Sequence, residues 1–400
     1  MRHPRRLFLL ATVVAATLWA AAPGSAAAAP PTAGAGPEAV ATAYLQARAA
    51  AVTAADPAAP LAQLVAPGSG LAARERLIAR GVGRNALRLG HLVDTVQTAV
   101  TLGDVAVAPD GASATVAAHV VTTITWHTRD GASDVEASGV DHVVTLASGV
   151  RGWQITGDDY TDVLTPAYLE DAGAPQALAK RAAQKLESGP SIRVRWLGRD
   201  GKGRIRTPGR AAARGQIRFP GRFRTAGVAG GGRAYMDTIV YDRAGAAAYA
   251  DRYALSYNPG VVRFSADCAN FVSQSARGGG MPTKPGTWDA GWWYDARGTS
   301  SPSDDQYSLS WINVGKQMGF WNGTRTDWVP GIANLGKGDA VYYDWSGDGV
   351  WDHVAMVVGT NAAGQKVIDA HTTDHYHVFW KLGYSTTQYR FARVRPQWIV

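Results

Sequence analysis

The residue best suited to act as a nucleophile in this chain is its single cysteine, Cys268. An Asp-His pair, Asp352-His353, follows 85 residues later. A thiol attacks a carbonyl carbon only as the thiolate, and its ordinary pKa of about 8.5 leaves it mostly protonated at neutral pH. An imidazole beside the sulfur could take up the proton and form an ion pair. The two residues therefore predict Cys–His nucleophilic catalysis, with Cys268 held as a thiolate.

A helix should position this thiol. Ser265 and Asp267 are residue types that cap helix N-termini, and they predict a helix over 268–277 that Gly278-Gly-Gly280 stops. The positive potential at its N-terminus would favour the thiolate, and the backbone N–H of Cys268 could help to hold an oxyanion. The alternative is a small apolar cysteine buried in the core.

A third residue should orient the imidazole through its second ring nitrogen. His353 opens a strand-like run over 353–359, and a second run over 366–370 follows. If the two runs form a hairpin, the residues opposite His353 fall near the end of the second run. Asp369 is our first choice for this role and His371 is our second. Because these two are two residues apart, both could share the face of His353.

Two segments have the composition of metal sites. Asp344-Trp-Ser-Gly-Asp-Gly349 matches the start of a calcium loop, but its twelfth position is Ala355 rather than glutamate, so a turn is favoured. A histidine-rich segment could bind zinc through His371, Asp374, His375 and His377. Alternating polar groups on the solvent face of a strand explain this segment equally well. We therefore predict no metal and no cofactor.

The C-terminal unit, residues 233–400, should be an α+β domain. It holds ten of the fourteen tryptophans and no glutamate, so any acid chemistry must use aspartate. Trp288, Trp292 and Trp293 could line a substrate groove or pack in the core. Besides the Cys268 helix, the pattern predicts a helix over 244–257 and strands over 340–343, 353–359, 366–370 and 389–394.

The N-terminal unit, residues 30–168, should be a separate α+β module. Helical spacing over 37–80 precedes four strand-like runs, near 87–102, 113–128, 133–146 and 152–155. This order suggests helices covered by a curved sheet, in a binding, spacing or folding module. Its histidines share no spacing and predict core or surface positions rather than ligands: His91, His119, His127 and His142.

Residues 1–29 read as a signal peptide. A basic start, Met1-Arg-His-Pro-Arg-Arg6, precedes an apolar run over 7–22 and a zone of small residues. The run is short for a membrane anchor, so we expect a secreted, extracellular protein with no membrane contact after cleavage. Arg5-Arg6 leaves twin-arginine export open beside general secretion. A lone cysteine outside the cell indicates a reactive thiol or a partner in another chain.

Residues 169–232 should contain a short helix over Tyr168–Lys185 and then a basic linker rich in Gly, Pro and Arg. Residues 193–224 hold eleven Lys or Arg and one acid, Asp200. Such a linker could adhere to anionic cell-wall polymers, or it could be a soluble spacer. Because no helical recognition pattern accompanies the charge, we expect no binding to nucleic acid.

Several motifs together resemble the putative amidase domain family of secreted bacterial proteins, over about residues 236–396. They are Tyr241-Asp-Arg243, Asp267-Cys-Ala-Asn-Phe-Val-Ser-Gln274, Gly338-Asp339, Asp352-His353 and His371-Thr372. The resemblance implies a papain-like fold related to the NlpC-type cell-wall peptidases, with Cys268 and His353 as the catalytic pair. We expect a cysteine amidase whose substrate is an amide bond in cell-wall peptidoglycan or a related peptide. The alternative is a wall-binding module without turnover, but the presence of both residues favours an enzyme.

Overall fold

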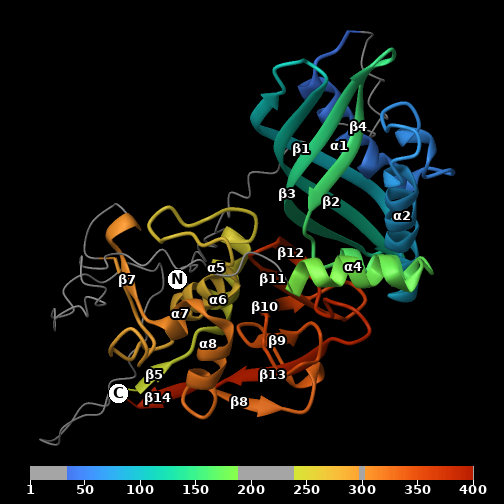
Figure 1. Cartoon of the computed structure of the whole chain (residues 1–400). Coiled ribbons are helices and arrows are strands. Elements are labelled where there is room, and N and C mark those ends of the chain that lie inside the picture. Colours follow the sequence, from blue (N-terminus) through green and yellow to red (C-terminus); the bar gives the residue numbers. More distant parts are fainter. Residues whose placement is uncertain (1–33, 188–237, 297–301, 400) are drawn as a thin grey trace, which may run out of the picture.

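The computed structural model describes residues 34–187, 238–296 and 302–399. The predicted signal peptide and the basic part of the linker lie outside these ranges. Within them, no helix combines the length and the apolar composition that crossing a bilayer requires. The architecture is α+β, as predicted, with helices packed on antiparallel strands (Figure 1).

The N-terminal unit consists of two helices, a four-stranded antiparallel meander and two further helices. Their bounds are α1 Pro37–Thr53, α2 Leu71–Arg88, β1 His91–Val107, β2 Ser113–Thr128, β3 Ser133–Gly149, β4 Gly152–Tyr160, α3 Thr165–Asp171 and α4 Gln176–Glu187. Proline at the first turn of α1 begins that helix, because its missing N–H would have no partner there. The single helix predicted over Tyr168–Lys185 is instead two, separated by Gly173 and Pro175.

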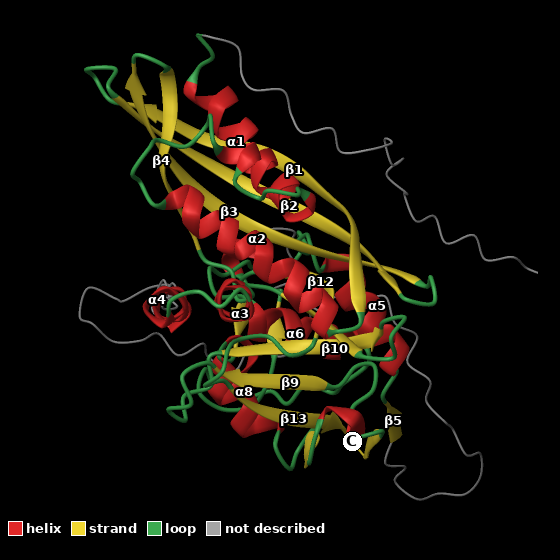
Figure 2. Ribbon diagram, turned by 90° about the vertical axis from the view of Figure 1, so that its right-hand side faces the viewer, coloured by secondary structure: helices red, strands yellow, loops and turns green. Residues whose placement is uncertain are grey.

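The four long strands curve around the two N-terminal helices (Figure 2). Alternate residues of β2 are buried, so one face of the sheet covers α1 and α2. The core contains Tyr44, Leu45, Val116 and Leu146, all fully buried or nearly so. The expectation of a curved sheet covering helices agrees with this arrangement.

The C-terminal unit places four helices on one face of a five-stranded antiparallel sheet. The helices are α5 Arg243–Tyr253, α6 Cys268–Gly278, α7 Leu309–Ile312 and α8 Val314–Trp321. The strands of the sheet are β8 Thr326–Val329, β9 Ala340–Asp344, β10 His353–Thr360, β11 Lys366–Ala370 and β13 Gln388–Val394. Short pairs are formed by β5 Thr238–Val240 with β14 Gln397–Ile399, and by β6 Tyr294–Asp295 with β7 Gln306–Tyr307.

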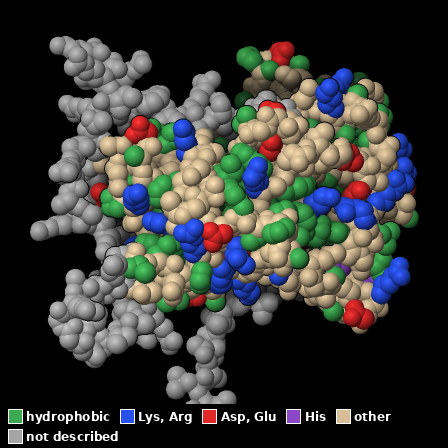
Figure 3. All heavy atoms as spheres, turned by 90° about the horizontal axis from the view of Figure 1, so that it is seen from below, with side chains coloured by type: hydrophobic (Ala, Val, Ile, Leu, Met, Phe, Trp, Pro, Cys, Tyr) green, Lys and Arg blue, Asp and Glu red, His purple; other side chains and the backbone are tan. Residues whose placement is uncertain are grey.

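One further strand, β12 Asp374–Phe379, joins the two units. It pairs with β11 on one side and with β3 on the other, so both units share one ten-stranded sheet. The two units are therefore joined by the backbone pairing of β12 with β3. Lys and Arg side chains occur at several separate places on the described part of the face in Figure 3.

The two faces of the C-terminal sheet have different surroundings. Val354 and Met356 of β10 pack in the core formed with α5 and α6. The intervening Ala355 and Val357 pack in a second core, to which Val163 of the N-terminal unit contributes. This alternation decides which side chains can meet Cys268.

Candidate active site

Cys268 is the first residue of α6 and is almost fully buried. This position confirms the predicted helix start. Asp267 occupies the N-cap position but makes no capping hydrogen bond through its side chain. Its Oδ1 instead accepts hydrogen bonds from the backbone N–H of Phe264 and from Asn270 Nδ2, at 3.0 and 2.9 Å.

Burial raises the pKa of the Cys268 thiol to about 11. Hydrogen bonds from the Thr372 side chain and from the backbone N–H groups of Val354 and Ala269 lower this pKa, and the Asp267 charge raises it. Burial has the largest effect on this pKa, so the thiol is neutral at pH 7. The sequence-based expectation of a thiolate at neutral pH is therefore wrong for this structure, because the sulfur is withdrawn from water.

His353 opens β10, as predicted, and its ring is also buried. It lies 5.4 Å from the ring of Trp345 and 5.5 Å from that of Tyr343, measured between centroids. Burial lowers the pKa of His353 to about 3, and the nearby His375 contributes to this lowering. The imidazole is therefore neutral at pH 7, like the thiol.

Strand alternation places the His353 ring on the face of the sheet opposite α6. Its cross-strand partner, Tyr343, belongs to the second core, whereas Val354 packs against the helices. The Cys268 sulfur contacts the backbone N–H of Val354, the residue that follows His353. The structure thus brings the two predicted catalytic residues to the same strand end, without a hydrogen bond between them in the described chain.

Both residues nevertheless border one cavity of about 500 Å³. Tyr257, Arg263, Trp351 and Asp374 line it from the C-terminal unit. The N-terminal unit also contributes to the wall, through His119, Asp141, Tyr160 and Leu186 among others. A pocket shared by a thiol and an imidazole, at the edge of a sheet and the start of a helix, is suited to nucleophilic attack on a bound carbonyl group.

The two residues proposed to orient His353 lie on the other face of the sheet. Asp369 is opposite Met356, in the direction of α5, and its Oδ1 accepts the backbone N–H of His377 at 2.7 Å. His371 uses both ring nitrogens elsewhere: Nδ1 is 2.8 Å from Asp267 Oδ2, and Nε2 is 2.7 Å from the carbonyl oxygen of Tyr253. Neither residue therefore orients His353, which corrects the prediction.

The pairing of His371 with Asp267 explains why a carboxylate can stand next to the thiol. Burial works to lower the pKa of His371, but the hydrogen bond and the charge of Asp267 outweigh it and raise the pKa. A positive imidazole would balance the Asp267 carboxylate, so the sulfur does not face an unpaired negative charge. His371 acts on Asp267 rather than on His353.

His375 is a residue that the sequence analysis considered only as a zinc ligand. It is fully buried, and its cross-strand partner Ala370 packs in the second core. The His375 side chain therefore lies on the same face of the sheet as the His353 ring. The Nε2 atoms of His353 and His375 are both buried and have no hydrogen-bond partner in the described chain. The Nε2 atom of His375 is 4.0 Å from Asp162 Oδ1 of the N-terminal unit.

Thr372 binds the start of α6 to the sheet. Its Oγ1 accepts the backbone N–H groups of Asp267 and Cys268, at 2.9 and 3.2 Å. The N–H of Cys268 is therefore already bonded and is not free to hold an oxyanion as predicted. Thr372 has a φ of 90°, in a region that side chains rarely adopt.

The other predicted sites have structural roles. Both oxygens of Asp344 accept backbone N–H groups from Gly347, Asp348 and Gly349, which makes the calcium-like segment a turn. Trp292 is fully buried and stacks on Trp311, so it packs in the core rather than lining a groove. The cavity is bordered instead by Trp345 and Trp351, which were not predicted to line a groove.

Residues 240–394 match the family described as a putative amidase domain. "Uncharacterized protein YhbB" of Bacillus subtilis (strain 168) is 32% identical over 161 residues, which cover 39% of this chain and 48% of that protein. The chain therefore spans about half the length of this curated relative.

A solved structure, that of the intermembrane space region of chloroplast protein ARC6, aligns with 31% of this chain and 92% of its own at 17% identity. Its TM-score of 0.23 supports no inference about fold or function. The family match, in contrast, covers the unit that carries Cys268 and His353. Residues 240–394 are thus similar to the putative amidase domain family.

Proposed function

We propose that the C-terminal domain hydrolyses an amide bond through an acyl-enzyme on Cys268. The observation that carries the proposal is that Cys268, at the start of α6, and His353, at the start of β10, border the same cavity. The amidase family match over this domain supports the reaction class. A papain-like arrangement of nucleophile helix and histidine strand remains part of the proposal.

The reaction begins from two neutral groups. His353 accepts the thiol proton as the sulfur attacks the carbonyl carbon, through one water molecule if the ring does not reach the sulfur directly. The tetrahedral intermediate collapses with cleavage of the C–N bond, and the imidazolium returns the proton to the leaving amine. Water then hydrolyses the thioester and regenerates the thiol. Substrate binding that excludes water would strengthen these proton transfers.

The cavity lining suggests a peptide as substrate. Arg263 lies over the ring of Tyr257 at 3.8 Å, so the cavity has both a cation and an aromatic surface. A guanidinium can bind a substrate carboxylate, and Trp351 can stack on a flat peptide or a sugar face. Cell-wall peptides carry both carboxylates and amide bonds. With export through residues 1–29 and wall binding through residues 193–224, the protein would act on peptidoglycan outside the cell.

Digestion of purified cell wall tests the proposal. The wild-type protein should release fragments with new amine and carboxyl ends, identified by mass spectrometry, and Cys268→Ser should release none. Circular dichroism and thermal unfolding must show that the variant keeps the fold. Release by the Cys268→Ser variant would contradict the cysteine mechanism.

A non-catalytic wall-binding module is the second candidate. The raised pKa of Cys268 and the missing hydrogen bond to His353 favour it. If this candidate is right, the wild type and Cys268→Ser should bind the cell wall equally, and neither should release fragments from it.

A further inference from the structure

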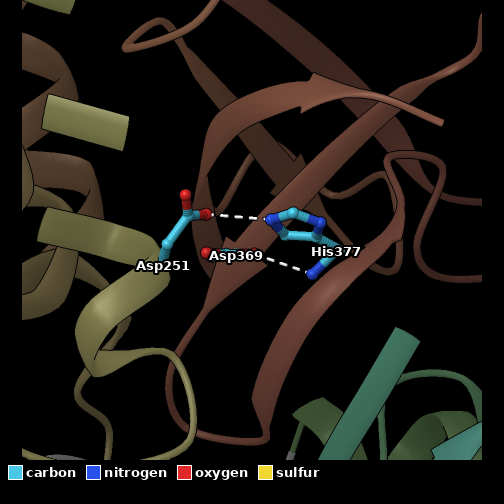
Figure 4. Close-up of side chains that lie close together, drawn as sticks. All are labelled: Asp251, Asp369 and His377. Carbon is cyan, nitrogen blue, oxygen red and sulfur yellow. Dashed lines mark hydrogen bonds and ion pairs between the residues drawn. The ribbon is translucent and has the colours of Figure 1, made fainter. Parts of the chain in front are cut away.

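A second cluster of ligand-type side chains lies outside the cavity, between α5 and the sheet (Figure 4). Asp251 comes from α5, Asp369 from β11 and His377 from β12. Each offers one ligand atom, and these atoms lie within 4.8 Å of one another. A helix and two consecutive strands that lie more than 100 residues after it thus converge on one point.

Asp369 is the buried member of this cluster. It is fully buried, and its Oδ1 accepts the N–H of His377. Its Oδ2 is buried and has no hydrogen-bond partner in the described chain. An unpaired carboxylate oxygen away from water is costly, and such an atom in a folded protein requires an explanation. Figure 4 shows this carboxylate next to that of Asp251.

Two neighbouring carboxylates repel each other unless a proton or a cation lies between them. Burial raises the pKa of Asp369, against the N–H of His377. The charge of Asp251 and a side-chain hydrogen bond with it, which needs a shared proton, raise this pKa further. A shared proton would neutralise the pair, but it would not account for the imidazole. His377 Nε2 lies 2.9 Å from Asp251 Oδ1, so the ring nitrogen faces the same point as the two acids.

We propose that Asp251, Asp369 and His377 bind one divalent transition-metal ion, for which Zn²⁺ is the best match. Imidazole nitrogen with carboxylate oxygen is a ligand set for zinc, whereas calcium and magnesium prefer oxygen alone. Asp251 and His377 are partly exposed, so the ion can enter from solvent and keep a water ligand.

This ion would fix α5 to the sheet rather than take part in the reaction. Tyr253 follows Asp251 by two residues, and its carbonyl oxygen is bonded to His371. His371 in turn holds Asp267, which precedes Cys268. The ion would therefore support the segment that carries the nucleophile, from the side opposite to the His353 ring.

Zinc titration of the untagged mature protein, after removal of metals with a chelator, tests the proposal. We expect one Zn²⁺ per chain by isothermal titration calorimetry and a rise in Tm of several degrees. Mg²⁺ and Ca²⁺ should give neither. Asp251→Asn, Asp369→Asn and His377→Ala should each weaken zinc binding at least about tenfold.

The matched control is His127→Ala. His127 also forms a partly exposed pair with an aspartate, Asp94, but no third ligand lies beside it among the residues that the structure describes. The His127→Ala variant should therefore bind zinc like the wild type. Asp251 lies on the exposed side of α5, so its variant should fold normally and separate lost binding from lost structure.

Two results would overturn the proposal. One is zinc binding that Asp251→Asn and His377→Ala leave unchanged. The other is no zinc binding by the wild type together with a higher Tm for Asp369→Asn. That result would show that Asp251 and Asp369 share a proton and do not bind a metal ion.

Discussion

At the scale of single residues, the ionisation of Cys268 decides how the site can work. Burial raises its pKa to about 11, so about one thiol in ten thousand is ionised at pH 7. Alkylation by iodoacetamide should therefore be slower than for a free peptide thiol. Its rate should rise about tenfold per pH unit up to about pH 11, because only the thiolate reacts.

This pH profile is measured as the rate of mass increase on Cys268, with a short cysteine peptide as the reference. His353→Ala should change the profile little, because the imidazole is neutral and makes no hydrogen bond to the sulfur in the described chain. Fast alkylation at pH 6 that His353→Ala abolishes would instead restore the ion pair that the sequence predicted.

The sequence identifies the residues of the pair but not their ionisation. The residue types around Cys268 and His353 predict a helix start and a strand start, and both are confirmed. Burial, however, arises from side chains of the neighbouring strand β9 and of the turn after it. Trp345 and Tyr343 cover the His353 ring. No local pattern reports that contact, so neither pKa could be predicted.

At the scale of elements, the hairpin of β10 and β11 explains why the third residue was misassigned. Near the turn of the hairpin, Thr360 is opposite Lys366. If this register continued without interruption, Asp369 would lie opposite Val357. Asp369 would then share the face of His353. A β-bulge between Val357 and Gly359 shifts the pairing by one residue, and Asp369 lies opposite Met356 instead. A one-residue shift moves every later side chain to the other face.

The contact between α6 and the end of β11 gives a prediction at this scale. Thr372→Ala should lower the free energy of unfolding by about 1–3 kcal/mol, because it leaves the N–H groups of Asp267 and Cys268 without their acceptor. It should also raise the pKa of Cys268 further, since the hydroxyl lowers it. Urea unfolding and the alkylation profile measure the two effects.

Thr372→Ser is the matched variant, because it keeps the hydroxyl and the backbone conformation. It should retain most of the stability and the pKa of the parent. Equal losses in the alanine and serine variants would mean that the methyl group, not the hydrogen bonds, holds this contact.

At the scale of the whole molecule, the N-terminal unit is part of the site. β3 pairs with β12, and residues of both units line the cavity around Cys268. Most helices and strands of each unit could be predicted from the sequence. The junction of the units could not, because pairing between β3 and β12 joins residues more than 200 positions apart. The N-terminal unit would then influence which substrates enter the cavity.

Gly139 on β3 tests this dependence. A Cβ atom there would lie 3.3 Å from the Cβ of Asp374 and from the ring of His119, both of which line the cavity. Gly139→Val should therefore displace β12 and lower the free energy of unfolding by about 1–3 kcal/mol. It should also raise the KM for cell-wall hydrolysis. Gly149→Val, on the same strand with open space around it, is the control and should change neither.

The two variants separate a shared structure from two independent units. If β3 and β12 form one sheet in solution, the wild type should unfold in a single transition, and Gly139→Val should shift that whole transition to lower temperature. The chemistry of the nucleophile should stay the same, so the alkylation profile of Cys268 should not change. Two separate transitions, of which Gly139→Val shifts only the lower, would show that the N-terminal unit does not support the cavity.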